Sequence, residues 1–163
     1  MNKIRMIALA ACMAATLDAS AQEQEIRLFS HRGGRMEHDE NTLSAFQASY
    51  DAGYRGFETD IRMTRDGALV ITHDSSLERT TDGTGTVEEK TEAEIRQLAT
   101  KQGNKMMFLD ELLEFLKGKE GLYVEFEMKT KPVELYPEER LHAYCDKLYD
   151  AVMAVKPADA VFV

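Results

Sequence analysis

Two carboxylates, Glu58 and Asp60, stand two residues apart in the run from Gly56 to Arg62. Charged residues alternate with other residues in this run, which is the two-residue period of a β-strand, so both carboxylates are predicted to leave the same face. Adjacent carboxylates repel each other, and one of them tends to keep its proton. A hard divalent cation such as Ca²⁺ or Mg²⁺ removes this conflict, because such ions take oxygen ligands. The pair therefore indicates a metal site, although the solvated face of an edge strand would give the same isolated pattern.

A second charged face is predicted between Val124 and Lys129, where Glu125, Glu127 and Lys129 alternate with apolar residues. A strand inside a parallel sheet is normally apolar on both faces. Buried charges are costly unless they meet a metal or one another. Glu127 is therefore predicted as a third metal ligand and Lys129 as a cation for an anionic substrate, although an exposed Glu–Lys pair would also explain the run.

Two histidines, His31 and His73, come at the ends of other predicted strands. Because imidazole titrates near neutral pH, two histidines beside a carboxylate cluster are predicted to act as general acid and general base. Metal ligation is the competing role, but hard cations prefer oxygen. Arg32 follows His31 directly, and its planar guanidinium suits bidentate contact with phosphate. The whole set indicates an oxyanion substrate, most simply a phosphodiester.

These residues need elements that bring them together. Strands are predicted at about 25–30, 56–63, 68–72, 122–129 and 159–163, and helices at about 43–52, 109–117 and 137–155. Such alternation is typical of a parallel α/β fold, in which active groups lie at the carboxyl ends of the strands. Residues 74–108 are predicted to be a mainly irregular insertion, with a capping box at 91–94. Cys145, on the apolar stripe of the last helix, is predicted to be buried.

The N-terminus is predicted to be a secretory signal peptide at residues 1–21, with basic residues, a short apolar run and an Ala-x-Ala cleavage site. The mature domain would then be 22–163, exported to the periplasm or outside the cell, and no other segment is apolar enough to span a membrane. Lipidation at Cys12 is an alternative reading. The net charge is −9, without a cluster of Lys and Arg, so nucleic acid is not expected as a partner. The oligomeric state stays open.

Taken in order, the motifs resemble those of the glycerophosphodiester phosphodiesterase family. The resemblance is close from His31 to about Leu98 and looser from Leu109 to Lys129. Its matching runs are His31-Arg32-Gly33, Glu40-Asn41-Thr42, Ala45-Phe46, Gly53 with Glu58-Thr59-Asp60, Thr64 with Asp66-Gly67, His73-Asp74 with Leu77 and Arg79-Thr80-Thr81, and Glu127-Met128-Lys129.

The resemblance implies a (β/α)₈ barrel that hydrolyses glycerophosphodiesters to glycerol 3-phosphate and an alcohol. It implies Ca²⁺ or Mg²⁺ on three carboxylates, two histidines as the acid–base pair, and two cations on the phosphate. The metal ligands would be Glu58, Asp60 and Glu127, the acid–base pair His31 and His73, and the phosphate-binding residues Arg32 and Lys129. The insertion at 74–108 would cover the glycerol end of the substrate.

The sequence departs from the family pattern in two ways. Asp39 stands where the family usually has proline, which predicts a looser loop. Such a barrel takes ~250 residues, so the chain is predicted to be an N-terminal portion with about four of the eight strands. Alone, a half barrel would expose sheet edges and is expected to be unstable or oligomeric. Alternative functions are a related phospholipase C or D type of phosphodiesterase, or a fragment that binds phosphodiesters without turnover.

Overall fold

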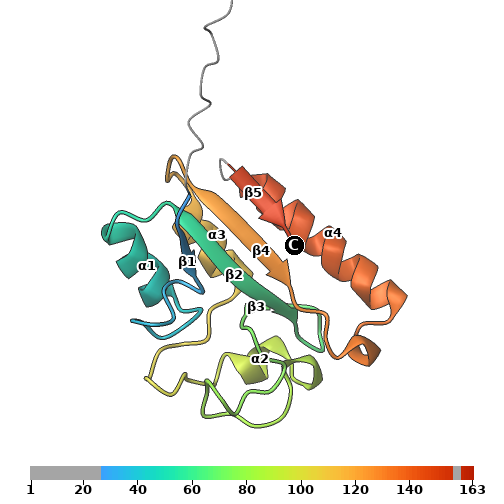
Figure 1. Ribbon diagram of the computed structural model, residues 1–163. Helices are drawn as coiled ribbons and strands as arrows, with labels where there is room; N and C mark the ends of the chain where they lie inside the picture. The colour runs from blue at the N-terminus through green and yellow to red at the C-terminus, as the bar shows by residue number, and fades with distance from the viewer. Residues whose placement is uncertain (1–26, 156–158) are drawn as a thin grey trace, which may run out of the picture.

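The structure is a computed structural model that describes residues 27–155 and 159–163. Its centre is a sheet of parallel strands in the order β1, β2, β4 and β5, to which β3 adds an antiparallel partner of β2 (Figure 1). The bounds are β1 (Phe29–His31), β2 (Gly56–Met63), β3 (Leu69–Ile71), β4 (Tyr123–Met128) and β5 (Asp159–Phe162). The predicted parallel α/β sheet is thereby confirmed.

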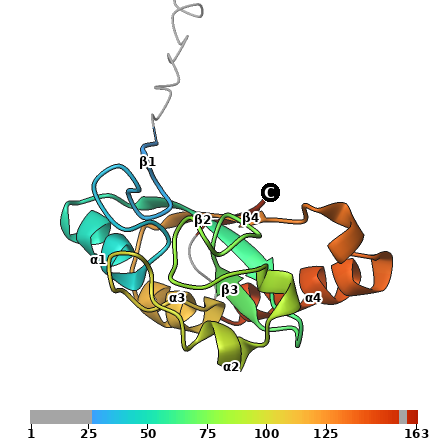
Figure 2. The ribbon, with the colours of Figure 1, turned by 90° about the horizontal axis from the view of Figure 1, so that it is seen from below.

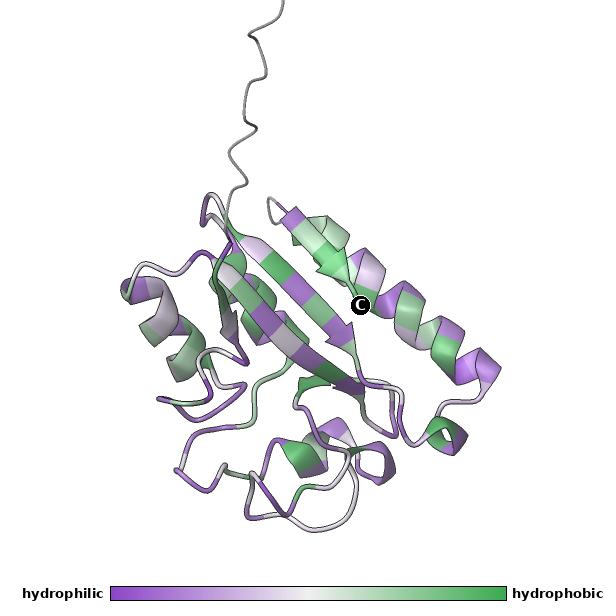
Figure 3. Cartoon of the chain, viewed as in Figure 1, coloured by the Kyte–Doolittle hydropathy of each residue, from purple (hydrophilic) through white to green (hydrophobic). Residues whose placement is uncertain are grey.

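Three helices cover one face of this sheet, as the view from below shows (Figure 2). They are α1 (Leu43–Asp51), α3 (Leu109–Leu116) and α4 (Glu138–Val155). The residues of β2 and β4 on this face are mostly apolar, with Thr59 as a buried exception; the fully buried apolar ones are Phe57, Ile61, Val124 and Phe126. Polar residues alternate with these along both strands, so that the opposite face is charged (Figure 3). The two-residue period therefore separates a hydrophobic core from a charged surface.

The helix α1 begins where the sequence predicts. The Thr42 hydroxyl accepts a hydrogen bond from the Ala45 amide at 3.3 Å, which satisfies one of the free amides of the first turn. Gly53, with φ 96°, follows the last turn in the left-handed region that favours glycine.

One core assignment in α4 is wrong, because Cys145 is exposed. The buried residues of this helix are Tyr144, Leu148 and Val152, which lie three to four residues apart. Cys145 directly follows Tyr144, so it is turned by about 100° from that inward position. The apolar stripe is therefore narrower than the sequence predicts.

Residues 74–108 contain two short elements, η1 (Val87–Glu89) and α2 (Glu92–Ile95), and pack with Ala68 and Val70 around a second hydrophobic cluster. This cluster consists of Ala68, Val70, Leu77, Val87, Ile95, Met106 and Phe108. The predicted capping box is present at the start of α2. A further short element, η2 (Val133–Leu135), joins β4 to α4.

The loose loop expected from Asp39 is not found. Its carboxylate accepts hydrogen bonds from the hydroxyl of Thr100 and, at 2.9 Å, from the amide of Asn104. The insertion thus fastens the loop that precedes α1.

The predicted signal peptide, Cys12 and the first residues of the predicted N-terminal strand lie outside the described residues. Within the described part, none of the helices combines the length and the apolar character needed to cross a bilayer.

Candidate metal centre and active site

Three carboxylates meet on the charged face of the sheet. Glu58 and Asp60 extend from β2 and Glu127 extends from β4, where it is the register partner of Asp60. One oxygen from each carboxylate lies within 4.8 Å of the oxygens of the other two. Asp60 is fully buried, whereas the side chain of Glu127 is 40% exposed. The structure therefore brings together the three residues predicted as metal ligands.

The electrostatics of this cluster are unfavourable for three ionised carboxylates. Burial, followed by the charge of Asp60 and, more weakly, that of Glu127, raises the pKa of Glu58 to about 7. A hydrogen bond from the Arg32 amide to Glu58 Oε2, at 3.0 Å, only partly opposes this rise. A cation placed among the carboxylates would relieve the repulsion.

The donor set of the cluster fits a hard divalent cation. Within residues 27–155 and 159–163, the buried oxygens Glu58 Oε1 and Asn41 Oδ1 in this region have no hydrogen-bond partner, and Asp60 Oδ1 has only an ion-pair contact with Lys129. Unpartnered buried oxygens are costly, and oxygen is the ligand that Ca²⁺ and Mg²⁺ prefer. These atoms have the chemistry of a metal site.

Asp60 is surrounded by three nitrogen-bearing side chains. The amide of Asn41 donates to Oδ2 at 2.9 Å, and Arg32 Nε lies 3.1 Å from the same oxygen. Lys129 Nζ lies 3.0 Å from Oδ1 and also contacts Glu127. Both cations predicted to bind phosphate thus lie beside the carboxylate cluster.

The loop after β1 reaches the cluster through unusual backbone geometry. Arg32 and Asn41 have φ values of 54° and 58°, in the left-handed region that residues other than glycine seldom adopt. This conformation accompanies the contact of the Arg32 amide with Glu58 and of the Asn41 side chain with Asp60. Both residues are buried. Surrounding contacts must hold these conformations in place.

His31 ends β1 and lies at the edge of the cluster, with Nε2 3.5 Å from Glu58 Oε2. Its side chain is 49% exposed, so it can reach a molecule bound above the sheet. Partial burial, followed by the charges of Arg32 and Arg35, lowers the pKa of His31. The neutral imidazole is therefore favoured at neutral pH.

His73 follows β3, whose antiparallel course returns the chain to the level of the carboxylate cluster. The neighbouring Thr72 amide donates to the Asp60 carbonyl at 2.9 Å. His73 Nδ1 is hydrogen-bonded to Asp74 Oδ1 at 2.6 Å. When Nδ1 carries the proton, this contact leaves Nε2 as the free nitrogen.

Sequence reasoning missed a chain of ion pairs that links the two halves of the site. Asp74 contacts Arg79, and Arg79 donates to both oxygens of Glu40, at 2.7 and 3.0 Å. Glu40 in turn accepts from Arg32 Nη1 at 3.2 Å. Hydrogen bonding from Arg79 lowers the pKa of Glu40 despite partial burial. The run His73-Asp74 carried a signal, because an acid beside a candidate histidine can orient it, whereas Glu40 is eight residues from its partner Arg32.

Comparison with known proteins agrees with this geometry. A family model described as "Glycerophosphoryl diester phosphodiesterase family" matches residues 31–159. A glycerophosphodiester phosphodiesterase of Caldanaerobacter subterraneus subsp. tengcongensis is 37% identical over 123 residues, which are 70% of this chain and 50% of the relative. One from Bacillus altitudinis is 30% identical, over 68% of this chain and 48% of the relative. The chain spans about half the length of these curated relatives.

Solved structures show the same fold. The crystal structure of a glycerophosphodiester phosphodiesterase from Agrobacterium tumefaciens has a TM-score of 0.68 and 28% identity, over 85% of this chain and 57% of that one. An Oleispira antarctica phosphodiesterase, solved in complex with the product sn-glycerol-3-phosphate, has a TM-score of 0.71 and 27% identity, over 84% and 56%. The predicted fold class, part of a (β/α)₈ barrel, is confirmed. The chain belongs to the glycerophosphoryl diester phosphodiesterase family.

Proposed function

We propose that this chain carries the catalytic centre of an enzyme that hydrolyses glycerophosphodiesters to glycerol 3-phosphate and an alcohol. The observation that carries the proposal is the cluster of three carboxylates, in which Glu58 Oε1 is buried without a partner, together with two histidines and two cations beside it. The names of the relatives and the product bound to the Oleispira antarctica enzyme support this reaction.

A divalent cation, Ca²⁺ or Mg²⁺, would be held by Glu58, Asp60 and Glu127. When bound, such an ion supplies positive charge that polarises a phosphoryl oxygen. The side-chain amide of Asn41 donates to Asp60 and so orients this proposed metal ligand. The donor oxygens suit both ions, so the choice between them rests on coordination number and cavity size.

Arg32 and Lys129 would bind the substrate phosphate. Each already lies beside Asp60 and is mostly buried, with side chains 8% and 15% exposed. Their charges offset those of the carboxylates, which would otherwise repel an anionic phosphodiester. The ion pair of Arg32 with Glu40 holds the guanidinium in place before substrate arrives.

His31 and His73 would form the acid–base pair. One imidazole takes a proton from the attacking oxygen as its bond to phosphorus forms. The other gives a proton to the alcohol oxygen as its bond to phosphorus breaks, so that water is added overall. Asp74 orients His73 through Nδ1, which leaves Nε2 for this transfer.

The decisive experiment measures glycerol 3-phosphate released from glycerophosphocholine by the chain with Ca²⁺ or Mg²⁺, and with a chelator. We expect release to need the cation and to be lost in the Glu58→Gln/Asp60→Asn variant. Glu125→Gln is the matched control, because Glu125 is the register partner of Glu58 on β4 but is not in the carboxylate cluster. Turnover that persists in excess chelator, or that survives the double substitution, would contradict the proposal.

A phosphodiester-binding role without turnover is the second candidate, because the chain spans only about half of its relatives. That role predicts that cation and glycerophosphocholine bind, as judged by calorimetry, while no product forms. A phospholipase C or D type of reaction would instead release products other than glycerol 3-phosphate and the alcohol.

We further propose that the protein is exported, on the basis of the predicted leader at residues 1–21. N-terminal sequencing of protein recovered from outside the cytoplasm should begin at Gln22. A start at Cys12 with a lipid attached would support the lipoprotein alternative instead.

A further inference from the structure

Arg62 and Glu88 form a buried ion pair next to the catalytic centre. Arg62 Nη1 donates to Glu88 Oε1 at 2.7 Å, and the two side chains are 6% and 1% exposed. Glu88 also accepts from the Tyr136 hydroxyl at 2.8 Å and from the Ser75 hydroxyl at 2.6 Å. Both carboxylate oxygens are therefore satisfied away from the metal cluster.

The same guanidinium holds two loops at once. Arg62 Nε donates to the His73 carbonyl at 2.9 Å, and Nη1 donates to the Lys131 carbonyl at 2.9 Å. One of these loops carries His73, and the other directly follows Lys129 at the end of β4. A single side chain on β2 thus fixes the spacing of the two loops that border the site.

Glu88 fastens the His73 loop at a second point. Its contact with the Ser75 hydroxyl lies two residues beyond His73, and the Val87 amide donates to the Ser75 carbonyl at 2.9 Å. Residues 73–75 are therefore held at one end by Arg62 and at the other by η1. These contacts restrict the backbone of residues 73–75, and therefore the position from which the His73 side chain extends.

Stability alone does not explain this pair. A buried ion pair is often no more stable than well-packed apolar residues of similar volume, because both charges lose their hydration. The guanidinium of Arg62 has several donors in a fixed geometry. It can therefore donate at the same time to a carboxylate and to two carbonyls, which an apolar pair cannot do.

We propose that the Arg62–Glu88 pair is a positioning device that sets His73 relative to Lys129 for the reaction, an inference that rests on the proposed function. A cavity of about 690 Å³ beside the pair is lined by Arg62, His73, Glu127, Lys129 and Lys131 among others. Arg62 therefore lines the same cavity as His73, one of the proposed acid–base residues, and Lys129, one of the proposed phosphate-binding residues.

The test compares Arg62→Met with Arg62→Met/Glu88→Met and Arg62→Lys in the full chain. The single Met variant leaves Glu88 buried without a partner and should unfold more easily. The double variant removes both charges and should recover stability. We nevertheless expect its kcat on glycerophosphocholine to stay about 10²-fold below that of the unmodified chain, with KM unchanged. Arg62→Lys keeps the charge but not the fork, so its kcat should also stay low.

Hydrogen exchange supplies a readout that does not depend on turnover. In the double variant the Val87 amide should exchange faster, while the Lys129 amide, which donates to the Ile61 carbonyl at 3.0 Å, should not change. Recovery of kcat together with stability, or an unchanged Val87 amide, would overturn the proposal. If the unmodified chain releases no glycerol 3-phosphate, the proposed function fails, and the exchange result alone decides whether the pair positions the loop.

Discussion

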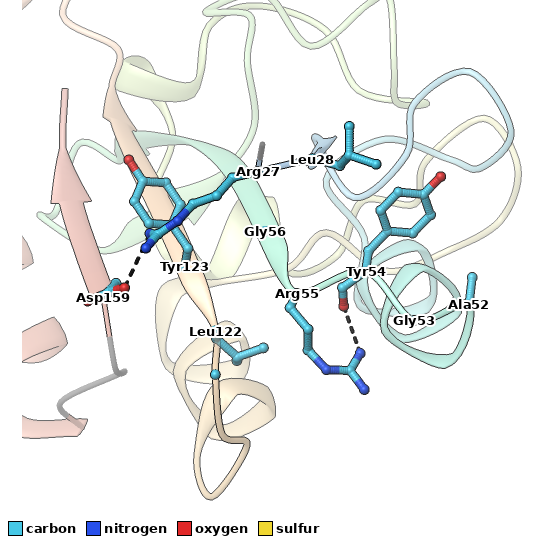
Figure 4. A pocket seen from close by; sticks show the side chains of 11 residues that line it. Arg27, Leu28, Ala52, Gly53, Tyr54, Arg55, Gly56, Leu122, Tyr123 and Asp159 are labelled. Carbon is cyan, nitrogen blue, oxygen red and sulfur yellow. Dashed lines mark hydrogen bonds and ion pairs between the residues drawn. The ribbon is translucent and has the colours of Figure 1, made fainter. Parts of the chain in front are cut away.

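The two ends of the parallel sheet carry hollows of similar size but opposite character. At the amino ends of the strands a cavity of about 670 Å³ is lined by residues such as Arg27, Tyr54 and Tyr123 (Figure 4). Its Arg27–Asp159 ion pair spans 3.3 Å, with side chains 44% and 58% exposed. At the carboxyl ends, in contrast, Asp60 is fully buried among cations and another carboxylate.

The volume of a cavity therefore does not tell which end of the sheet carries the candidate active site. Charges at the amino end keep their hydration, so their interactions are weak and screened. Asp60 and Arg32 at the carboxyl end are buried and have largely lost theirs, which strengthens their interactions, and burial also raises the pKa of Glu58. Substitutions at the two ends should therefore have very different effects.

The largest effect is expected for the histidines at the carboxyl end. His31→Ala and His73→Ala should each lower turnover of glycerophosphocholine by about 10²–10⁴-fold, since each would remove a proposed proton-transfer group. The cation should still bind, because the carboxylates are intact. His142→Ala, on the exposed surface of α4, is the matched control and should leave turnover unchanged. Equal losses in all three variants would show that the loss of turnover is not specific to the two histidines of the candidate site.

A smaller effect is expected for Asn41, which contacts one of the proposed metal ligands. Asn41→Ala removes the amide that orients Asp60 and should weaken cation binding by about 10- to 100-fold in calorimetry. Gln47→Ala removes a similar amide–carboxylate bond, to Asp51 at 2.7 Å on the exposed face of α1, and should leave cation affinity unchanged. An affinity that is the same in both variants would mean that Asn41 does not support the site.

The buried carboxylate of Glu88 should make stability depend on pH. Burial alone would raise its pKa, but hydrogen bonds from Ser75, Tyr136 and Arg62 lower it overall. A carboxyl whose pKa is lower in the folded state stabilises the fold above its unfolded pKa, and this stabilisation is lost as the pH falls through the folded pKa.

Urea unfolding of Glu88→Gln tests this prediction. At pH 7 the variant should be less stable by about 1.5–3 kcal/mol, the contribution of a hydrogen bond to a charged group. Below pH 4.5, the usual pKa of a glutamate, the gap between the variant and the unmodified chain should narrow. A gap that is constant with pH would show that the ionised form of Glu88 contributes nothing.

The smallest effect is expected at the amino end. Arg27→Gln breaks the exposed pair with Asp159 and should change the free energy of unfolding by less than about 1 kcal/mol. Turnover should not change. A large loss of activity in this variant would show that the amino end also serves the reaction.

How well each part of the candidate site can be predicted from the sequence depends on what brings its residues together. Glu58 and Asp60 share a face because of the strand period, and Glu127 joins them through parallel register, so the sequence pattern alone predicts this cluster. The partners of Arg62 could not be predicted. Glu88 is 26 residues away, in the insertion, and packing of that irregular segment decides where it lies.

The fold shows the same division between regular and irregular parts. The repeating strands and helices of the sheet are predictable, because their periods are local. Which residues of a helix are buried is harder to predict, because burial depends on the neighbours that cover the helix. The exposed Cys145 is an example.

The left-handed backbone at Arg32 and Asn41 has an evolutionary consequence. Glycine at either position would relax the backbone, since it adopts positive φ without a steric penalty. It would also delete a side chain that contacts Asp60. At these two positions, glycine would favour the stability of the fold, whereas the residues present favour the proposed chemistry. A homologue with glycine at either position should therefore gain stability but lose a contact with Asp60. A homologue that keeps the proposed activity should keep a residue other than glycine in the strained left-handed conformation.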